Sequence, residues 1–446
     1  MKRFRLLTLL TIAFLVVCAS FGIANIAVAA DEEARIYSPH AESVQVWNNK
    51  IYVLFNTEYH EGMSYYDYMA SEVIEFDAEL NKLRSVKLES AGNSGKNAAG
   101  MALYDGKLYV GCRGGLLGGG LWGDVWEVDA AAMTAKQVLD VEKVSGLTTA
   151  ATPYAISIAA DGTAFCLIGY YDSTDWSFIS KLYVTTAAKL SAGDIGTAAP
   201  DTESKSGAYW NLAYEDAIDT LWFMAGEQIE ARDKAGALLR AFKPADLGDN
   251  AASIAVWKGG SGINGIFYAA ITSDYTAASV GTITRNGDDF VVNADEVTNF
   301  GGDTQGFTFL DHNGADRALV REYNYGPNDF VKIYDPTNWT APIKDVSGWA
   351  SNIHNVTSHG RFLYLTAYES YEAGASTQDP GEVVRVDMGA GYVRDRSYQA
   401  EAIVVGDGST GESGGGSSGC DAGASVLAAL AFVALSHTLR RCRAKK

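Results

Sequence analysis

A pair of strand-like segments recurs along most of the 446-residue chain, and its spacing constrains the fold more than any other feature. The first segment of each pair follows a polar or glycine-containing turn and alternates aromatic with aliphatic residues. Between Tyr52 and Leu363 there are six steps of about 52 residues each. The seven copies lie at 49–53, 105–110, 161–166, 219–223, 264–268, 316–320 and 359–364. A turn followed by period-two alternation is typical of a hairpin with a half-buried strand.

The second segment of each pair often ends in aspartate. Five copies that share this ending lie at 73–77, 125–129, 229–233, 331–335 and 383–387, and weaker copies fill the gaps at 181–185 and 281–285. An apolar segment precedes each first segment, and a shorter strand-like segment follows each second one. Each repeat is therefore predicted to contribute four strands.

Seven four-stranded repeats predict an all-β fold, a seven-bladed β-propeller with four antiparallel strands per blade. Six or eight blades are the alternatives. Seven repeats of about 52 residues fill 35–400, and no sustained 3.6-residue period predicts the helices of an α/β fold or a helical solenoid. The blade pattern resembles propellers of the YVTN-like class. It lacks the Gly-His and Trp-Asp pairs of WD40 blades, and its Gly-Gly pairs do not recur at one blade position as in kelch repeats.

The N-terminal segment has the plan of a secretory signal peptide. Lys2, Arg3 and Arg5 precede an apolar run at 6–17, and Ala27 and Ala29 form an A-x-A site that predicts cleavage before Ala30. The predicted organisation is a signal peptide at 1–29, a propeller at 30–400, a Gly/Ser-rich linker at 401–419 and a C-terminal sorting or transmembrane signal at 420–446.

The C-terminal segment combines a Gly/Ser spacer, a cysteine, a short apolar run and a basic end. The spacer leads to Cys420, the apolar run spans 422–435, and five Arg and Lys residues lie at 440–446. This order resembles bacterial C-terminal sorting signals of the Synergist-CTERM type, with the GlyGly-CTERM and MYXO-CTERM types related in plan. The resemblance implies cleavage near Cys420 by a sorting protease and attachment at the cell surface. The alternative is a retained membrane anchor with its basic end in the cytoplasm.

The composition restricts the class of partner. The chain has 35 basic and 54 acidic residues and a formal net charge of −19, which argues against nucleic acid, because a phosphate backbone is bound by basic surface. Only Cys112 and Cys166 lie in the propeller segment. Two thiols do not make a disulfide framework, so two buried thiols are expected, with a single disulfide between neighbouring repeats as the alternative.

The connections between the second and third strand of each blade should share one face of a propeller, and here they are rich in tyrosine and acidic residues. Tyrosine offers a flat apolar ring with a polar tip, which suits a glycan or a protein or peptide ligand. The alternative is that these tyrosines pack over blade edges. The candidate ligand-binding residues are Tyr59, Tyr65, Tyr66, Trp122, Tyr170, Tyr171, Trp176, Tyr323, Tyr325, Tyr368, Tyr371, Asp172 and Glu369. The glycine-rich segment 113–122 lacks the Gly-Lys-Ser/Thr ending of a phosphate loop.

Signals for catalysis or metal binding are sparse. His40, His60 and His354 should meet where blades 7 and 1 adjoin, and with Glu58 or Glu61 they offer transition-metal ligands, although no His-Glu-x-x-His spacing is present. Asp172 paired with Glu369 would suit glycoside cleavage. Asp246, Asp249 and Asn250 carry no complete calcium-loop motif. We therefore predict no cofactor, with Ca²⁺ held by Asp246, Asp249 and Asn250 as the alternative.

These patterns predict an exported propeller, anchored at the bacterial cell surface or outer face of the envelope, that binds an extracellular glycan or protein. Its other predicted partners are the cell envelope, through the C-terminus, and the sorting protease. One alternative is an exported hydrolase or lyase that uses carboxylates, and clustering of three carboxylates or histidines at the mouth would favour it. Another is a structural component of the surface layer.

Overall fold

The computed structural model divides the chain into two compact units. One comprises residues 38–402. In the other, β33 (Ile403–Val405) pairs antiparallel with the first three residues of β1 (Arg35–Trp47). No helix within the ranges below is long and apolar enough to cross a membrane. The residues described are 35–61, 65–91, 93–114, 122–147, 150–171, 178–199, 204–205, 211–225, 227–256, 265–272, 277–301, 303–312, 315–323, 330–350, 353–367 and 380–405.

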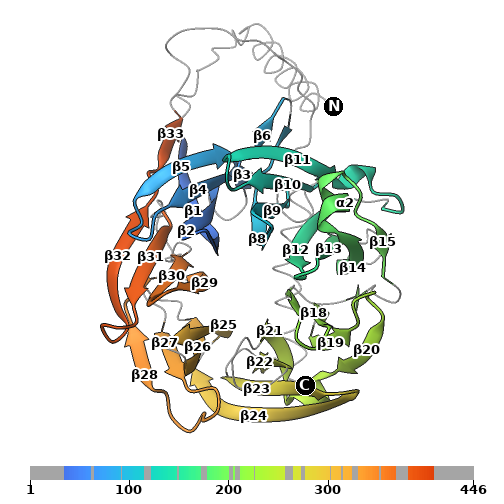
Figure 1. The fold of residues 1–446 in the computed structure, drawn as a ribbon, viewed down its shortest axis with the longest axis vertical. Helices are drawn as coiled ribbons and strands as arrows, with labels where there is room; N and C mark the ends of the chain where they lie inside the picture. The colour runs from blue at the N-terminus through green and yellow to red at the C-terminus, as the bar shows by residue number, and fades with distance from the viewer. Residues whose placement is uncertain are drawn as a thin grey trace, which may run out of the picture. The chain divides into compact units, whose positions relative to one another are not determined.

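The larger unit is a seven-bladed β-propeller with four antiparallel strands per blade, as the repeats predict (Figure 1). We denote the strands of a blade A to D from the inside of the ring outward. The first three blades consist of β1, β2 (Lys50–Glu61), β4 (Glu72–Phe76) and β5 (Lys82–Lys87); β8 (Ala98–Tyr104), β9 (Lys107–Cys112), β10 (Asp124–Asp129) and β11 (Thr134–Asp140); and β12 (Ala151–Ile158), β13 (Thr163–Tyr171), β14 (Phe178–Thr186) and β15 (Thr197–Ala198).

The remaining blades follow the same order. They consist of β17 (Leu212–Glu215), β18 (Thr220–Ala225), β19 (Gln228–Arg232) and β20 (Leu238–Phe242); β21 (Asn250–Val256), β22 (Gly265–Ile271), β23 (Ala277–Asn286) and β24 (Asp289–Gly301); β25 (Asp303–His312), β26 (Ala315–Tyr323), β27 (Phe330–Tyr334) and β28 (Lys344–Ser347); and β29 (Ile353–His359), β30 (Phe362–Ala367), β31 (Glu382–Asp387) and β32 (Val393–Gln399).

A few short elements decorate the blades. Strand β3 (Tyr65–Tyr68) extends β2 as a hairpin, and β16 (Ser204–Lys205) pairs with β14. The strands β6 (Glu89–Ser90) and β7 (Asn93–Ser94) form a small hairpin. The helices are η1 (Val141–Lys143), α2 (Ala187–Ser191) and α3 (Pro244–Leu247). Because neighbouring strands are antiparallel, A–B and C–D turns share one face of the ring, and B–C and D–A connections share the other.

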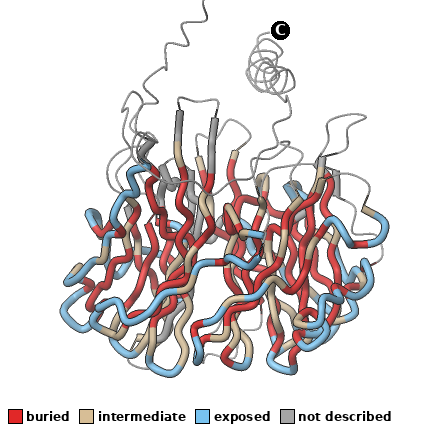
Figure 2. Tube along the Cα trace, turned by 90° about the horizontal axis from the view of Figure 1, so that it is seen from above, coloured by how far each residue is buried: buried red, intermediate tan, exposed pale blue. Residues whose placement is uncertain are grey.

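The core of the propeller lies between blades. Each neighbouring pair of blades, including 7 and 1, shares one cluster of buried apolar side chains among the described residues. Figure 2 shows buried strand residues running through this unit, with exposed residues on the turns along one edge. The thiols of Cys112 and Cys166 are buried in these clusters and free, so the disulfide alternative is excluded.

The recurring aspartates at the ends of C strands stabilise the C–D turns. Asp129 Oδ1 accepts hydrogen bonds from the backbone N–H groups of Ala131 and Ala132, both at 2.9 Å. Asp77, Asp233, Asp335 and Asp387 accept backbone N–H groups of their own turns in the same way. An aspartate that hydrogen-bonds the backbone two residues onward makes a tight turn favourable, which is the physical reason for the repeat.

A second recurring contact joins neighbouring blades. In three blades a B-strand tyrosine donates its hydroxyl hydrogen bond to a backbone carbonyl in the C–D turn of the next blade. These bonds join Tyr52 to Ala130 (3.2 Å), Tyr109 to Ala187 (3.4 Å) and Tyr364 to Ala78 (2.8 Å). Burial raises the pKa of Tyr52 and of Tyr364 to about 12, so both hydroxyls remain donors at neutral pH.

Side-chain contacts and a backbone hydrogen bond from the N–H of Gly381 to the carbonyl of Pro39 (2.7 Å) close the ring between blades 7 and 1, because within residues 38–402 each blade is built from strands that are consecutive in the chain. Arg385 Nη1 donates a hydrogen bond of 2.6 Å to the carbonyl of Ala78, which also accepts the hydroxyl of Tyr364. The ring of Tyr398 packs edge-on against Phe76, with centroids 4.7 Å apart. Closure therefore depends on hydrogen bonds to the C–D turn and to β1 of blade 1, and on the apolar cluster between these blades.

We expect Tyr364→Phe and Tyr52→Phe each to lower the free energy of unfolding by about 1 kcal/mol, because each removes one buried hydrogen bond. Urea denaturation followed by circular dichroism measures this change. Tyr104→Phe is the matched control, since the Tyr104 hydroxyl forms no hydrogen bond with another described residue. Equal stability of Tyr364→Phe and the control would contradict the assigned role in closure.

Candidate functional site

The inner strands share a local irregularity that places one extra residue on strand A. In every blade except the fourth, the register between strands A and B shifts by one residue among the described positions. The extra residues are Glu42, Ala99, Tyr154, Ala252, Gln305 and His354. A β-bulge re-aims a side chain, and bulges are common beside functional sites. These six positions occupy the same level of their blades, toward the face of the B–C connections.

At the junction of blades 7 and 1, two of these bulge residues meet. His354 Nδ1 lies 3.4 Å from Glu42 Oε1. Within blade 1, His40 on β1 contacts Glu58 on β2, with 2.9 Å between His40 Nε2 and Glu58 Oε1. The side chains of His40, Glu42 and Glu58 are at least 94% buried, whereas His354 keeps 42% of its side chain exposed. His354 is therefore the accessible member of this group, which we call the axial cluster.

Hydrogen bonds of the Asn56 side chain support the axial cluster. Its amide Nδ2 donates to the carbonyl of Ala98 at 2.9 Å, and its Oδ1 accepts from the N–H of Ala98 at 2.8 Å. Ser71 Oγ donates to the same Oδ1 at 2.8 Å, and Nδ2 also approaches Glu42 Oε2 at 3.5 Å. Asn56 thus links blade 1 to the bulge of blade 2 and fixes the carboxylate of Glu42.

The electrostatic environment of the cluster keeps both members of the Glu42–His354 pair close to neutral. Burial raises the pKa of Glu42 to about 7; Arg113 and His40 oppose this shift, and Glu58 adds to it. Desolvation by the protein groups packed against the buried part of His354 lowers its pKa, and the charges of Arg321 and Arg113 act in the same direction. Near neutral pH, the pair therefore offers an acidic proton on Glu42 beside an uncharged imidazole.

Two arginines flank the cluster from blades 2 and 6. Arg113 follows strand β9 directly, and its guanidinium carbon lies 5.6 Å from the ring centroid of the bulge residue Tyr154. Arg321 lies on β26 opposite Gly306, next to the bulge of blade 6, and is 8% exposed. Both guanidinium charges act on His354, so basic and acidic groups from four adjacent blades form one arc, which Tyr154 extends into blade 3.

The arrangement does not make a metal site from the described side chains. No three histidine, cysteine, aspartate or glutamate side chains in the described ranges are placed to hold a metal ion. The expected meeting of His40, His354 and Glu58 is found, but each histidine contacts a different carboxylate. The side chains of His60 and Glu61 lie outside the description. In the weak calcium motif, Asp246 Oδ2 accepts the N–H of Lys243 at 2.9 Å and caps helix α3.

The predicted ligand-binding residues are only partly described. Trp122 and Tyr170 are half-buried and pack against the apolar cluster between blades 2 and 3, as the alternative of packing over blade edges expects. Tyr59 is half-buried on β2, in a segment expected to be a loop that instead continues as the β2–β3 hairpin. For Tyr65, Tyr66, Tyr171 and Tyr323 the structure describes the backbone alone. Trp176, Tyr325, Tyr368, Tyr371, Asp172, Glu369 and Cys420 lie outside the described residues.

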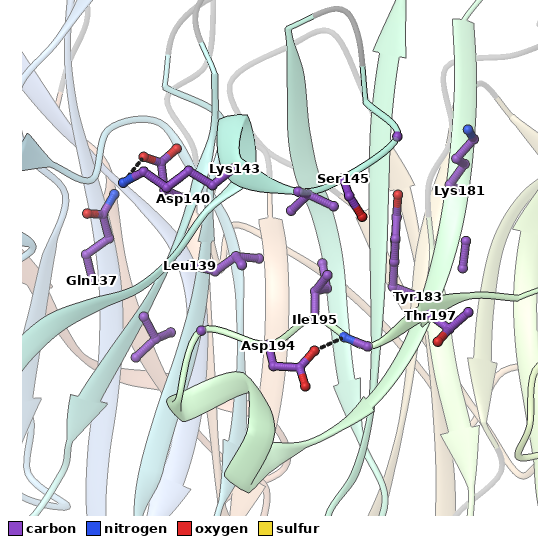
Figure 3. A pocket seen from close by; sticks show the side chains of 16 residues that line it. Gln137, Leu139, Asp140, Lys143, Ser145, Lys181, Tyr183, Asp194, Ile195 and Thr197 are labelled. Atoms are coloured by element: carbon purple, nitrogen blue, oxygen red, sulfur yellow. Dashed lines mark hydrogen bonds and ion pairs between the residues drawn. The ribbon is translucent and has the colours of Figure 1, made fainter.

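A separate groove of 920 Å³ lies between the outer strands of blades 2 and 3 (Figure 3). Its charged groups have partners within the protein: Lys143 pairs with Asp140 at 3.0 Å, Asp194 accepts the N–H of Gly196 at 2.8 Å, and Lys181 Nζ lies 5.7 Å from the ring centroid of Tyr170. Its lining residues belong to β11, β14, β15 and the turns beside them. We therefore regard the axial cluster as the stronger candidate site.

Sequence reasoning missed Glu42, Arg113, Arg321 and Tyr154 as members of the site. Alignment of the inner strands would have placed Glu42, Tyr154 and His354 at one blade position, where blades 2 and 5 carry alanine and blade 6 carries glutamine. The bulge itself leaves no signature in these short apolar runs, because it is defined by pairing with strand B.

Comparison with known proteins shows no relative close enough to indicate a function. No protein-family model matches the chain, and no curated protein matches its sequence. Solved structures similar to it include the WD40 β-propeller domain of Doa1 (TM-score 0.45, 11% identity, covering 75% of this chain and 94% of that one). Another is dihydro-heme d1 dehydrogenase NirN in complex with DHE (TM-score 0.43, 12% identity, covering 84% of this chain and 73% of that one). A third is apo AztD from Citrobacter koseri (TM-score 0.40, 9% identity, covering 84% of this chain and 97% of that one). The chain is thus a seven-bladed β-propeller on the strength of its own strand pairing.

The Glu42→Gln variant should gain stability over the wild type as pH rises. The folded-state pKa of Glu42 is about 7 against an ordinary value of 4.5, so the wild type loses stability as pH rises between these values, whereas glutamine stays neutral. We expect the advantage of the variant to grow by about 2 kcal/mol between pH 5 and pH 7.5. Urea denaturation at both pH values measures it.

The matched control for this measurement is Glu79→Gln, in the exposed β4–β5 turn. Its difference from the wild type should be the same at both pH values. If the difference in free energy of unfolding between Glu42→Gln and the wild type is also the same at both pH values, the pKa of Glu42 is equal in the folded and the unfolded chain, and the prediction is wrong.

Proposed function

We propose that this chain is an exported, cell-surface-anchored β-propeller that binds an extracellular ligand, a glycan or a protein, through the face of its B–C connections. The observation that carries the binding function is the axial cluster. Four ionisable side chains, His40, Glu42, Glu58 and His354, meet on the inner strands of blades 7 and 1, and three of them are almost fully buried. Burial of ionisable groups costs stability, so such a cluster is a functional-site candidate.

The position of the cluster supports binding on this face. Glu58 lies at the end of β2 that leads into the B–C connection, where Ser38 pairs with it. His354, the accessible member, presents an uncharged imidazole that either donates or accepts a hydrogen bond. The Tyr- and acid-rich B–C segments begin and end on the same face, so Tyr66, Tyr171 and Tyr371 belong to the proposed surface.

Export and anchoring are proposed from the two end segments of the sequence. The signal-like residues 1–29 and the sorting-like residues 420–446 predict passage across the inner membrane and retention at the surface. A net charge of −19 suits a soluble exported domain.

Arrays of glycans and peptides probed with the labelled full chain test the binding function. We expect His354→Ala to weaken binding of a positive ligand about tenfold, as loss of one hydrogen bond in a desolvated site does. Tyr66→Ala, Tyr171→Ala and Tyr371→Ala should each weaken it as well. Glu79→Gln, on the opposite face, is the control for an indirect effect. Full binding by all four site variants would remove this face from the proposal.

A second candidate function is hydrolysis or lyase chemistry on a glycan. The axial cluster brings two carboxylates and two histidines together, and clustering of such groups is the feature that would favour an enzyme. Glu42, with a pKa of about 7, has the proton affinity that suits a general acid at neutral pH. We expect any glycan cleavage to disappear in Glu42→Gln and the wild-type rate to fall above about pH 7. Cleavage that persists in Glu42→Gln would exclude Glu42 as the acid and return attention to Asp172 and Glu369.

A further inference from the structure

The charged groups around His354 define the chemical character of the site. Arg113 lies on blade 2 and Arg321 on blade 6, the blades beside 1 and 7, and the charges of both disfavour the protonated imidazole. Both charges therefore make a positive contribution to the electrostatic potential at His354. This sign is opposite to that of the chain as a whole, whose formal net charge is −19, so it arises from the local placement of the two guanidinium groups.

The carboxylates of the arc leave this positive potential largely in place. Glu42 holds its proton to about pH 7 because it is buried, so near neutrality it carries only part of a negative charge. The carboxylate of Glu58 contacts His40 at 2.9 Å, whereas His354 contacts Glu42. A protonated Glu42 is also an O–H donor, which an anionic oxygen accepts.

Hydrogen-bond donors without protein partners lie along the same arc. Arg113 Nε is buried and has no hydrogen-bond partner among the described residues. Thr152 Oγ1, two residues before the bulge residue Tyr154, is also buried without one, and Thr152 is 9% exposed. Buried donors are normally paired, so unpaired ones beside a positive site indicate that a ligand with acceptor oxygens completes them.

Tyr154 orients Arg113 within the arc. The guanidinium carbon lies 5.6 Å from the ring centroid, a cation–π contact that restricts the position of the long side chain. An arginine that is held in place loses less entropy when it forms two parallel hydrogen bonds to a carboxylate or a phosphate. The site is thus prepared for a planar or tetrahedral group of anionic oxygens.

We propose that the arc from blade 6 to blade 3 binds the anionic group of a small ligand, a carboxylate or a phosphate, between the guanidinium groups of Arg113 and Arg321. This inference rests on the proposed binding function and narrows it to ligands that carry such a group. His354 and the acidic proton of Glu42 supply uncharged hydrogen bonds beside the anion, and Thr152 Oγ supplies a further donor.

Isothermal titration calorimetry of the full chain at pH 7 tests this, with glucuronate, glucose 6-phosphate, inorganic phosphate and glucose as probes. We expect at least one anionic probe to bind at least ten times more tightly than glucose, and Arg113→Gln to weaken that binding tenfold or more, as loss of a charge-assisted hydrogen bond does. Binding of glucuronate without binding of either phosphate identifies a carboxylate site. Binding of both phosphates without glucuronate identifies a phosphate site.

The matched control is Arg240→Gln, which removes a positive charge from the outer strand of blade 4. It should bind like the wild type. Arg321→Gln should weaken anion binding as Arg113→Gln does. Where the buried Arg321 substitution prevents folding, a comparison of the affinities of Arg113→Gln and Arg113→Lys decides, because lysine keeps the positive charge. Equal affinity for glucose and the anions, no binding of any probe, or full affinity in Arg113→Gln would each overturn the inference.

The two proposals fail in different ways. A neutral ligand found on the arrays and lost in His354→Ala, without any preference for anions, preserves the binding function and removes the anion site. An anion bound through Arg113 by a chain that captures no glycan or peptide preserves the anion site and removes recognition of an extracellular glycan or protein.

Discussion

The packing of each blade on the next is the constraint on which the rest of the structure depends. A four-stranded sheet has two faces and cannot bury both alone, so the apolar side chains of each blade become a core only when a neighbour covers them. Among the described residues, all seven interfaces carry such a cluster. Tyr52, Tyr109 and Tyr364 add a hydrogen bond to the next blade and set the distance between sheets.

The same packing creates the candidate site. Glu42 and His354 are 312 positions apart in the chain and come within 3.4 Å of each other because blade 7 closes on blade 1. Closure is made by a backbone hydrogen bond from Gly381 to Pro39 and by the side chains of Tyr364 and Arg385, both bound to the carbonyl of Ala78. Ring closure and the geometry of the axial cluster are therefore coupled, and loss of either bond should loosen the contact between the two bulges.

Local patterns predicted the fold well, because their physical causes are local. The strands follow from period-two alternation, and the C–D turns follow from aspartates such as Asp129 that bind their own backbone. The first B–C connection was wrongly expected to be a loop: residues 65–68 pair with 58–61 and continue the sheet. Its alternation of polar and aromatic residues resembles an exposed loop, and only a partner strand distinguishes the two.

The sequence by itself determined the number of blades, the strands within each and the identity of the turns, since these depend on residues close together in the chain. The export and anchoring signals are predictions of the same local kind. Tertiary structure decided which side chains share the axis. A bulge shifts the register by one residue, and a shift of one residue reverses the face to which a side chain points, so Glu42, Tyr154 and His354 reach the site only through pairing and closure.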